Sequence, residues 1–418
     1  MGDNKLKIVI VGHVDHGKST LIGRLFYDTD SLPSDKIEEI RRRCEDLGRE
    51  MEFAFLLDHL QEEREQGITI DTAQSFFKTD KRGYVIIDAP GHREFLKNMI
   101  TGASQAECAI LIVDAVDGVQ EQTKRHAYIL DMLGLKQVVV VINKMDLVDF
   151  NEKRFKEVKG LVEAFLDSIN VKPSFFIPIS AKRGDNVAKK GDTMSWYNGY
   201  TLLEALDTLN NQKSPVDKPL QFPVQDVYKI GDKRILVGRI ENGRIKKGQQ
   251  VVFLPSQKES IIKSIEVFME DRIEAETGES IGITLKDPLF IERGEIICEK
   301  GYQPSRVDRF KANIFWMSQR PLDINERLTI RCATQEMSCT IDTIEKRVDS
   351  SSLETIERDA DKLLFTEVGS VIIKTKKPIV IENFNEIKEL GRFVLVRDKD
   401  TIAGGIVTHT SDLISENL

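Results

Sequence analysis

The first half of the chain alternates short apolar, β-branched runs with stretches of helical periodicity. Strands are predicted at 7–11, 75–79, 84–88, 109–114, 137–142 and 175–179, with helices between most of them, for example at 93–101 and 123–133. Continuous apolar strands that alternate with helices indicate a mostly parallel sheet covered on both faces. Ligands of such sheets bind at the carboxyl ends of the strands. The polar residues at those ends are therefore the first candidates for a binding site.

Beyond a polar, proline-ended stretch at 210–215 that is typical of a linker, the period of the pattern changes. Apolar and polar residues now alternate over 222–230, 234–241, 249–254 and 260–268, with Asn242-Gly243 and Lys247-Gly248 as turn signals. We expect a small closed β-barrel that ends near Lys300. A second β segment covers about 306–410, with strands expected at 310–315, 327–332, 338–348, 370–375, 379–381 and 392–396.

Composition narrows the class of protein. A chain of 418 residues is long enough for two to four domains. Its net charge of −8 argues against a general nucleic-acid binder but leaves room for a local basic patch. No apolar stretch approaches the roughly 20 residues that span a bilayer, and the N-terminus lacks a signal peptide's apolar core. Five scattered cysteines without a C-x-x-C pair favour reduced thiols, so we expect a cytoplasmic protein.

The first predicted strand runs directly into a phosphate-binding motif, G-x-x-x-x-G-K-S, which a helix follows. Gly12 and Gly17 let the backbone curl so that its N–H groups point at a phosphate, and the helix N-terminus adds its positive dipole end. Lys18 can reach the β- and γ-phosphates, and the Ser19 hydroxyl can ligate Mg²⁺. The nucleotide contacts predicted here are Gly12, His13, Val14, Asp15, His16, Gly17, Lys18, Ser19 and Thr20. The two histidines invite a metal-site interpretation, but beside a phosphate loop we expect them to support the loop or to lie at the surface.

A phosphate loop alone does not distinguish ATPases, kinases and GTPases, so the later strand ends decide. Asp88 can hold Mg²⁺ through water, and the Gly91 N–H can meet a γ-phosphate. Thr69, in Gly67-Ile68-Thr69-Ile70, could ligate Mg²⁺ only when a γ-phosphate is present, so its loop would be ordered in one state and released in the other.

Two further loops predict guanine as the base. In Asn143-Lys144-Met145-Asp146, the Asp146 carboxylate can accept from N1–H and the 2-amino group of guanine, a pair of donors that adenine lacks. Lys144 would lie along the base. Ser180-Ala181-Lys182, at the next strand end, would back the base with a main-chain N–H. The cofactors expected are therefore GTP and Mg²⁺.

These motifs together resemble the translational GTPases of the elongation factor Tu and elongation factor 1-alpha type along nearly the whole chain. The matching stretches are 12–20, 63–71, 88–92, 143–146 and 225–231. The resemblance implies an α/β P-loop GTPase domain over residues 1–212, followed by two β-barrel domains over 213–303 and 304–418. It also implies that His92 positions the attacking water, with Val14 and Ile68 as an apolar gate, and that Asp15 lies near a monovalent cation.

Within this group, four stretches are more similar to the GTPase (large) subunit of the bacterial two-subunit sulfate adenylyltransferase: 55–64 with 74–79, 114–126, 347–349 and 382–384. That resemblance implies a nucleotidyltransferase subunit that couples GTP hydrolysis to formation of adenylyl sulfate and pyrophosphate from ATP and sulfate. The adenylyl transfer would belong to a separate small, ATP-binding subunit in a hetero-oligomer, with neither a membrane nor a nucleic acid as partner.

One departure keeps other functions open, because many members of that subunit family have aspartate where this chain has His16. The alternative is a translation elongation factor that delivers aminoacyl-tRNA to the ribosome, which requires a tRNA-binding surface with a strong inverse dependence on salt. A third interpretation is an assembly or stress GTPase of the same architecture with neither partner.

Overall fold

The structure is a computed structural model, and it describes residues 5–32, 37–38, 42, 53, 74–88, 106–210, 216–231, 233–267 and 270–410. The chain divides into two compact units, Met1–Asn211 with Ser350–Ser352, and Gln212–Asp349 with Leu353–Leu418. None of the described helices is long and apolar enough to cross a membrane.

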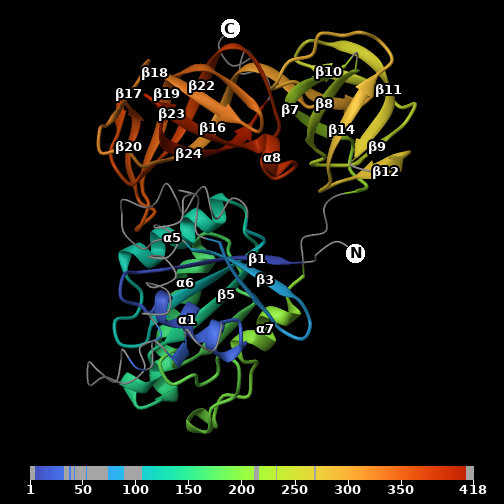
Figure 1. Cartoon of the computed structure of the whole chain (residues 1–418). Coiled ribbons are helices and arrows are strands. Elements are labelled where there is room, and N and C mark those ends of the chain that lie inside the picture. The colour runs from blue at the N-terminus through green and yellow to red at the C-terminus, as the bar shows by residue number, and fades with distance from the viewer. Residues whose placement is uncertain are drawn as a thin grey trace. The chain divides into compact units, whose positions relative to one another are not determined.

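The first unit is built on a six-stranded sheet in the order β2-β3-β1-β4-β5-β6 (Figure 1). Five strands are parallel and β2 runs antiparallel to β3 at one edge. Its strands are β1 (Leu6–Gly12), β2 (Gln74–Lys78), β3 (Gly83–Asp88), β4 (Cys108–Asp114), β5 (Gln137–Asn143) and β6 (Phe175–Pro178). All six strands predicted in this half of the chain are therefore confirmed, each to within about one residue at either end.

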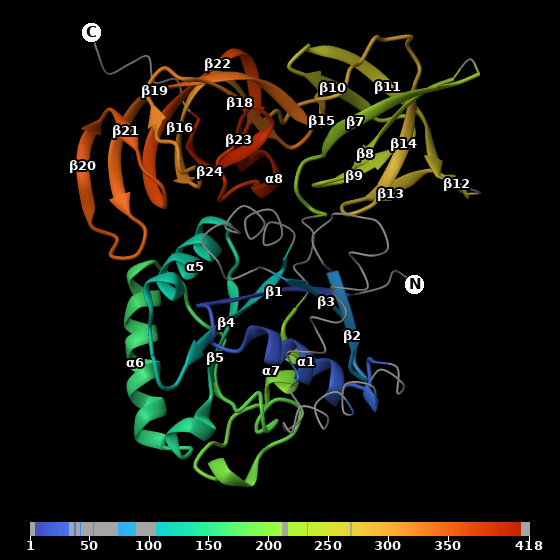
Figure 2. The same cartoon turned by 60° about the vertical axis from the view of Figure 1, so that its left-hand side comes forward.

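Helices cover both faces of this sheet (Figure 2). Apolar side chains of α1 (Lys18–Asp28) and α7 (Leu202–Thr208) pack with alternate residues of β1, β4 and β5 in one buried cluster, while α5 (Glu121–Met132) and α6 (Glu152–Ser168) pack on the other face. The helix predicted at 123–133 corresponds to α5, whereas the one predicted at 93–101 lies outside the described residues. Because β1 and β4 are buried on both faces, the loops at their carboxyl ends start from a closely packed sheet.

The second unit contains two closed β-barrels, so the predicted fold class, an α/β P-loop GTPase domain followed by β-barrels, is confirmed. The first barrel has the order β10-β15-β7-β8-β14-β11-β12 and closes through β10–β11. Its strands are β7 (Gln221–Ile230), β8 (Lys233–Arg239), β10 (Gln250–Leu254), β11 (Lys258–Val267), β12 (Glu270–Arg272), β14 (Ser280–Leu285) and β15 (Ile296–Glu299), with β9 (Arg244–Lys246) and β13 (Glu274–Glu276) as a small separate pair.

The second barrel has the order β18-β23-β24-β16-β22-β19-β20 and closes through β18–β19. Its strands are β16 (Ser305–Trp316), β18 (Arg327–Cys332), β19 (Gln335–Asp349), β20 (Thr355–Ala360), β22 (Glu367–Ile381), β23 (Arg392–Arg397) and β24 (Asp400–His409), with the pair β17 (Leu322–Asp323) and β21 (Lys362–Leu363) and the short helix α8 (Lys388–Gly391). The domain boundaries at 212/213 and 303/304 remain predictions.

The two strands predicted at 370–375 and 379–381 form one strand, β22, with an irregularity inside it. Opposite β16, the register moves from Val307↔Ile379 directly to Arg309↔Lys374, so the residues between are displaced from the ladder. The Thr375 hydroxyl donates to the carbonyl of Lys377 at 2.8 Å within this segment, and Pro378 has no N–H to pair. The apolar pattern breaks there although the strand continues.

A buried apolar cluster joins the two barrels. Val252, Leu254, Ile296 and Cys298 come from the first barrel and pack with Val380, Ile387 and Leu390 of the second. A fully buried cluster of this kind makes the two barrels one packed body.

Candidate functional site

The phosphate loop between β1 and α1 depends on its glycines. Gly17 has φ +90, and a Cβ there would lie 2.4 Å from Nδ2 of Asn143; a Cβ at Gly12 would lie 2.6 Å from the carbonyl oxygen of Ile112. No side chain caps the N-terminus of α1. Its first N–H groups, which have no partner within the helix, are therefore the donors that an anion at this loop would meet.

Lys18, Ser19 and Thr20 occupy the first turn of α1 and are half-buried. The Lys18 ammonium donates to the carbonyls of Gly12 and His13, both at 2.9 Å, so it bridges back to the beginning of the loop. Val14 is half-buried and Asp15 is exposed with φ 64. The Lys18 ammonium therefore ties the start of the α1 helix to the first two residues of the predicted phosphate loop.

Asn143, at the end of β5, ties two loops together. Its Nδ2 donates to the carbonyl of His16 at 2.9 Å, and its Oδ1 accepts the main-chain N–H of Ala181 at 2.9 Å. The side chain is buried, and both ends of the amide have main-chain partners. Asn143 thus fixes the phosphate loop relative to the loop at 180–182, a structural connection that the sequence motif does not reveal by itself.

Asp146 lies beside Ser180, as the two predicted base-binding loops require. The Ser180 hydroxyl donates to Oδ1 of Asp146 at 2.6 Å and accepts the N–H of Arg183 at 3.2 Å. Met145, which is buried, anchors the turn by donating its N–H to the carbonyl of Ile179. The Asp146 carboxylate is half-buried, so an oxygen of it remains for a ligand, while Lys182 is exposed.

Sequence reasoning missed Asp114, which ends β4. Its Oδ2 lies 2.6 Å from the Lys144 ammonium, and the side chain is 1% exposed. The signal that could have found it is the parallel pairing of β4 and β5, which places Asp114 directly beside Asn143 at the carboxyl edge. A buried carboxylate at that position needs a cation close by.

Of the three histidines near the loop, His16 and His126 are buried and His13 is half-buried. His16 is fully buried, so a surface position is excluded for it; its Nδ1 lies 3.3 Å from the carbonyl of Ile112, and burial lowers its pKa. The His13 ring lies 5.1 Å from it, and His126 of α5 is also buried, which lowers the pKa of His126 to about 3. All of the described residues together contain no group of three or more His, Cys, Asp or Glu placed to hold a metal ion.

Several predicted residues cannot be placed. Thr69, Gly91 and His92, like Ile68 of the predicted gate, lie outside the described residues. Asp88 ends β3, where its backbone pairs in register with Ile10 of β1. Asp88 and the phosphate loop that leads into the helix of Ser19 therefore leave the same edge of the sheet from neighbouring strands. A carboxylate with a hydroxyl is the hard oxygen donor set that Mg²⁺ prefers.

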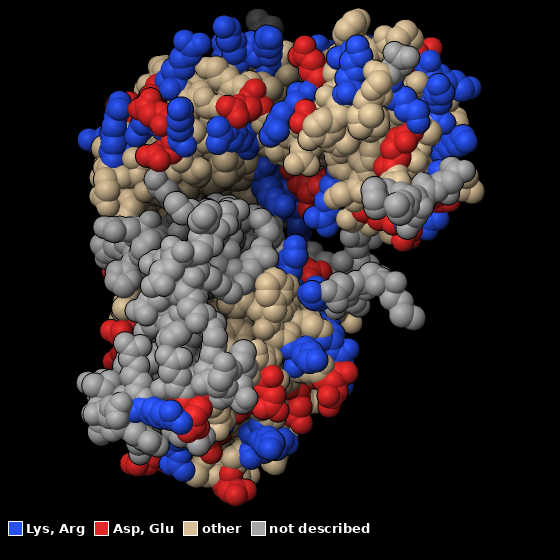
Figure 3. Space-filling view, in the orientation of Figure 1, with Lys and Arg blue, Asp and Glu red and all other residues tan. Residues whose placement is uncertain are grey.

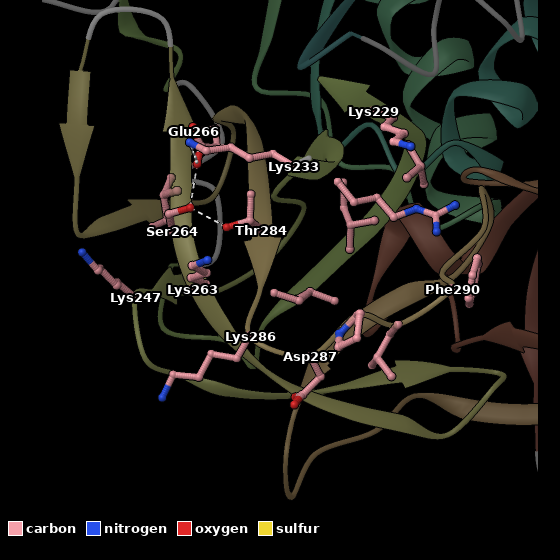
Figure 4. A pocket seen from close by; sticks show the side chains of 17 residues that line it. Lys229, Lys233, Lys247, Lys263, Ser264, Glu266, Thr284, Lys286, Asp287 and Phe290 are labelled. Carbon is pink, nitrogen blue, oxygen red and sulfur yellow. Dashed lines mark hydrogen bonds and ion pairs between the residues drawn. The ribbon is translucent and has the colours of Figure 1, made fainter. Parts of the chain in front are cut away.

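The first barrel carries a separate pocket of about 1110 Å³ whose rim is rich in cations (Figure 4). The basic residues that line it are Lys229, Lys233, Arg234, Lys247, Lys263 and Lys286, against the carboxylates of Glu266 and Asp287. On the face drawn in Figure 3, Lys and Arg side chains gather over the barrels, with acidic side chains among them. This is the kind of local basic patch that the overall net charge left open.

The two acidic side chains of this pocket have partners within the barrel. Ser264 donates to Glu266 at 2.6 Å, Lys233 lies 3.6 Å from the same carboxylate, and Ser260 donates to Asp287 at 2.7 Å. The Arg234 guanidinium lies 4.8 Å from the centre of the Phe290 ring, which is 74% exposed. An exposed aromatic ring among cations offers stacking and charge in one place.

The strand, the glycine-bounded phosphate loop and the tied loops at the ends of β4, β5 and β6 define a P-loop nucleotide-binding domain, here followed by β-barrels. Comparison with known families assigns it further: the elongation factor Tu GTP binding domain matches residues 3–212, elongation factor Tu domain 2 matches residues 233–298, and the GTP-eEF1A C-terminal domain-like family matches residues 309–408. The chain belongs to the elongation factor Tu and elongation factor 1-alpha family of GTPases.

Curated relatives match along nearly the full length. Elongation factor 1-alpha of Methanosphaerula palustris is 42% identical over 409 residues, covering 96% of both chains. Elongation factor 1-alpha of Pyrococcus furiosus is 42% identical over 418 residues, covering 96% of this chain and 97% of the relative. The solved structure of sup35 complexed with GDP covers 98% of this chain at 25% identity with a TM-score of 0.46, so the family assignment rests on the sequence matches.

These comparisons overturn one prediction. The chain is not the GTPase subunit of sulfate adenylyltransferase, because the relatives that span it are named elongation factor 1-alpha; the expected transferase activity, ATP and sulfate chemistry and small-subunit partner are wrong with it.

The structure gives a physical reason for the error in the second barrel. Arg347 lies 2.6 Å from Glu367 and 2.9 Å from Glu357, so it joins neighbouring strands. Asn383 donates to the carbonyl of Thr408 at 2.7 Å, and Phe384 is buried. Residues that resembled those of the sulfate adenylyltransferase subunit thus hold the barrel together.

Proposed function

We propose that this protein is a translation elongation factor, which binds aminoacyl-tRNA in its GTP state and releases it at the ribosome after hydrolysis. One observation carries the proposal: proteins named elongation factor 1-alpha match 96% or more of this chain at about two-fifths identity. The match includes the GTP-binding domain and both β-barrels. If these relatives share a binding partner, a chain that binds it should contain all of the domains that they have. This chain matches all three family regions.

In this proposal, the first unit supplies the switch. The phosphate loop from Gly12 to Thr20 cradles the phosphates, and Asp146 with Ser180 and Ala181 selects guanine. Mg²⁺, held by Ser19 and Asp88 with Thr69 added in the GTP state, would neutralise charge between the β- and γ-phosphates. His92 orients water, and loss of the γ-phosphate releases the loops that carry Thr69 and Gly91.

The pocket of the first barrel supplies a surface for nucleic acid. Six basic side chains line it, while its two carboxylates already have hydrogen-bond or ion-pair partners, so an arriving phosphate backbone meets an excess of positive charge. Phosphate contacts of this kind release counterions and make binding steeply salt-dependent. Phe290 and Arg234 offer a platform on which an unpaired base can stack.

The test compares two nucleotide states and two ligands. We expect aminoacyl-tRNA to bind the GTP-loaded chain more tightly than the GDP-loaded chain, with an affinity that falls steeply between about 50 and 200 mM salt. Hydrolysis of GTP should rise when ribosomes, message and aminoacyl-tRNA are added together. If tRNA binds equally weakly in both nucleotide states and ribosomes leave hydrolysis unchanged, the proposed function is wrong, whatever the chain does with GTP.

A further inference from the structure

Asp114 divides its two carboxylate oxygens between two tasks. Oδ1 accepts the N–H of Val116 at 2.7 Å and of Asp117 at 3.4 Å, which closes the turn after β4. Oδ2 lies 2.6 Å from the Lys144 ammonium. The residue is 1% exposed, whereas the Lys144 side chain is 29% exposed. Asp114 is thus the fixed partner of the pair.

The turn around Asp114 is held from several sides. Arg154 of α6 donates from Nε to the carbonyl of Ala115 at 2.7 Å and from its terminal nitrogen to that of Val116 at 2.9 Å. The Ala115 N–H donates to the carbonyl of Asn143 at 2.8 Å, which joins the ends of β4 and β5. A long lysine side chain that meets so rigid a carboxylate loses most of its rotamer freedom in advance of any ligand.

The backbone of Lys144 is itself constrained. Its φ of 62 is left-handed, an uncommon conformation for a residue with a Cβ, and it begins the short 3-10 turn Met145–Val148 that carries Asp146. Side chain and main chain of Lys144 are therefore both set by the surrounding structure, one by Asp114 and the other by the turn.

We propose that Asp114 is a positioning residue for nucleotide binding: by fixing the ammonium of Lys144, it lays the methylene stem of that lysine along the purine ring. The inference rests on the proposed nucleotide site at Asn143–Asp146. Because a stem along the ring face does not contact the 2-amino group, Asp114 supports affinity for any purine base placed there, whereas Asp146 supports the choice of guanine.

The experiment titrates GDP and IDP, which differ only in the 2-amino group, against Asp114→Asn. The asparagine keeps an oxygen for the Val116 N–H but loses the charge that holds Lys144. We expect both dissociation constants to rise by about tenfold, with their ratio unchanged. Asp117→Asn is the matched control, since it removes the same charge three residues later from an exposed side chain, and it should leave both constants within about twofold.

A double-mutant cycle with Lys144→Met separates positioning from a purely structural role. Lys144→Met alone should weaken both ligands by about the same tenfold, so the prediction survives even if Asp114→Asn fails to fold. In the Lys144→Met background, Asp114→Asn should add less than about twofold. A full tenfold effect in that background, an altered GDP-to-IDP ratio, or no loss with either single variant would overturn the proposal. If wild-type chain does not bind GDP, it is the proposed nucleotide site that fails instead.

Discussion

The loops at the carboxyl edge of the sheet and the pocket of the first barrel follow opposite principles. In the loops, the important side chains are buried or half-buried, and each has a specific partner: Asn143 with two main-chain groups, Asp114 with Lys144, Ser180 with Asp146. In the pocket, the basic side chains are exposed, and they come from β7, β8, β11 and the residues that follow β9 and β14. The loops are fixed by geometry, whereas in our proposal the pocket acts through summed charge.

This difference explains why the sequence pointed to the nucleotide but not to the macromolecular partner. Where every partner must have one chemistry at one spacing, the residues form a motif that can be recognised in the chain. Where many lysines on different strands contribute similar, additive attractions, no single position is obligatory and no motif arises. The nucleotide was therefore predicted from motifs, whereas the macromolecular partner was predicted wrongly.

The largest effect expected concerns hydrolysis alone. His92→Ala should lower the rate of GTP hydrolysis by roughly a hundredfold or more, because a residue that orients the attacking water acts on the transition state. GTP affinity should stay nearly unchanged, which single-turnover kinetics with a parallel binding titration would show. A tenfold loss of affinity, about 1.4 kcal/mol, would contradict the role assigned to His92.

The second prediction tests how strictly the loops depend on one group. Asp146→Asn should weaken GTP by roughly a hundredfold, because guanine's N1–H and 2-amino donors lose their acceptor, and should improve xanthine nucleotides. A competition titration of XTP against GTP would measure the change in the ratio of the two affinities. If preference does not move, the guanine assignment is wrong; if the variant binds tRNA equally well with XTP and with XDP, the two regions work as separate sites.

The third prediction tests whether the pocket acts through charge. Changing Lys229, Lys233 and Arg234 together to Gln should weaken aminoacyl-tRNA by about tenfold at moderate salt and flatten the slope of log affinity against log salt by up to about three. Filter binding at several salt concentrations gives both numbers. Lys300→Gln, an exposed change in the same barrel outside the pocket, should have little effect. Equal losses in both variants would assign the effect to overall charge, not to the pocket.

The smallest effect concerns the pH dependence of stability in the first unit. His126 is buried and its pKa is lowered to about 3, so the folded chain leaves it neutral while the unfolded chain protonates it near its usual pKa of about 6.5. The free energy of unfolding should therefore fall as pH drops below about 6.5, by about 1.4 kcal/mol at pH 5.5.

His126→Leu should remove that part of the slope. Far-UV circular dichroism during urea unfolding at pH 7.5 and 5.5 would measure it, since every described helix of more than four residues lies in the first unit. A slope that is the same in both proteins would mean that another group, and not His126, takes up the proton.

Two of the barrel strands that sequence patterns missed, β14 and β24, share a physical cause. β14 and β24 were not predicted, and each contains glycine where a neighbouring side chain fills the space: a Cβ at Gly282 would lie 2.6 Å from Ile235, and one at Gly405 would lie 2.4 Å from the Phe393 ring. Tertiary packing removed the apolar residue that alternation needs. The buried strands β1 and β4 show the converse, because their packing demands continuous apolar residues and so made them easy to predict.

Prediction of the site also failed where contacts depend on the tertiary structure. Motif spacing predicted a phosphate loop and two base-binding loops, and these nucleotide contacts stay predictions. It did not reveal the connection of Asn143 to His16 and Ala181, which exists only after the strands are paired. Asp114 was missed for the same reason: its partner follows in the chain thirty positions later and becomes a neighbour only through the register of β4 with β5.

The apolar cluster that joins the barrels also contains a natural reporter. Cys298 is fully buried there, and burial raises the pKa of its thiol to about 12, so the reactive thiolate is scarce and no reagent can reach it. Its rate of alkylation therefore measures how often this buried cluster opens. A ligand that stabilises the second unit would slow the alkylation of Cys298, and a ligand that destabilises it would speed the alkylation up.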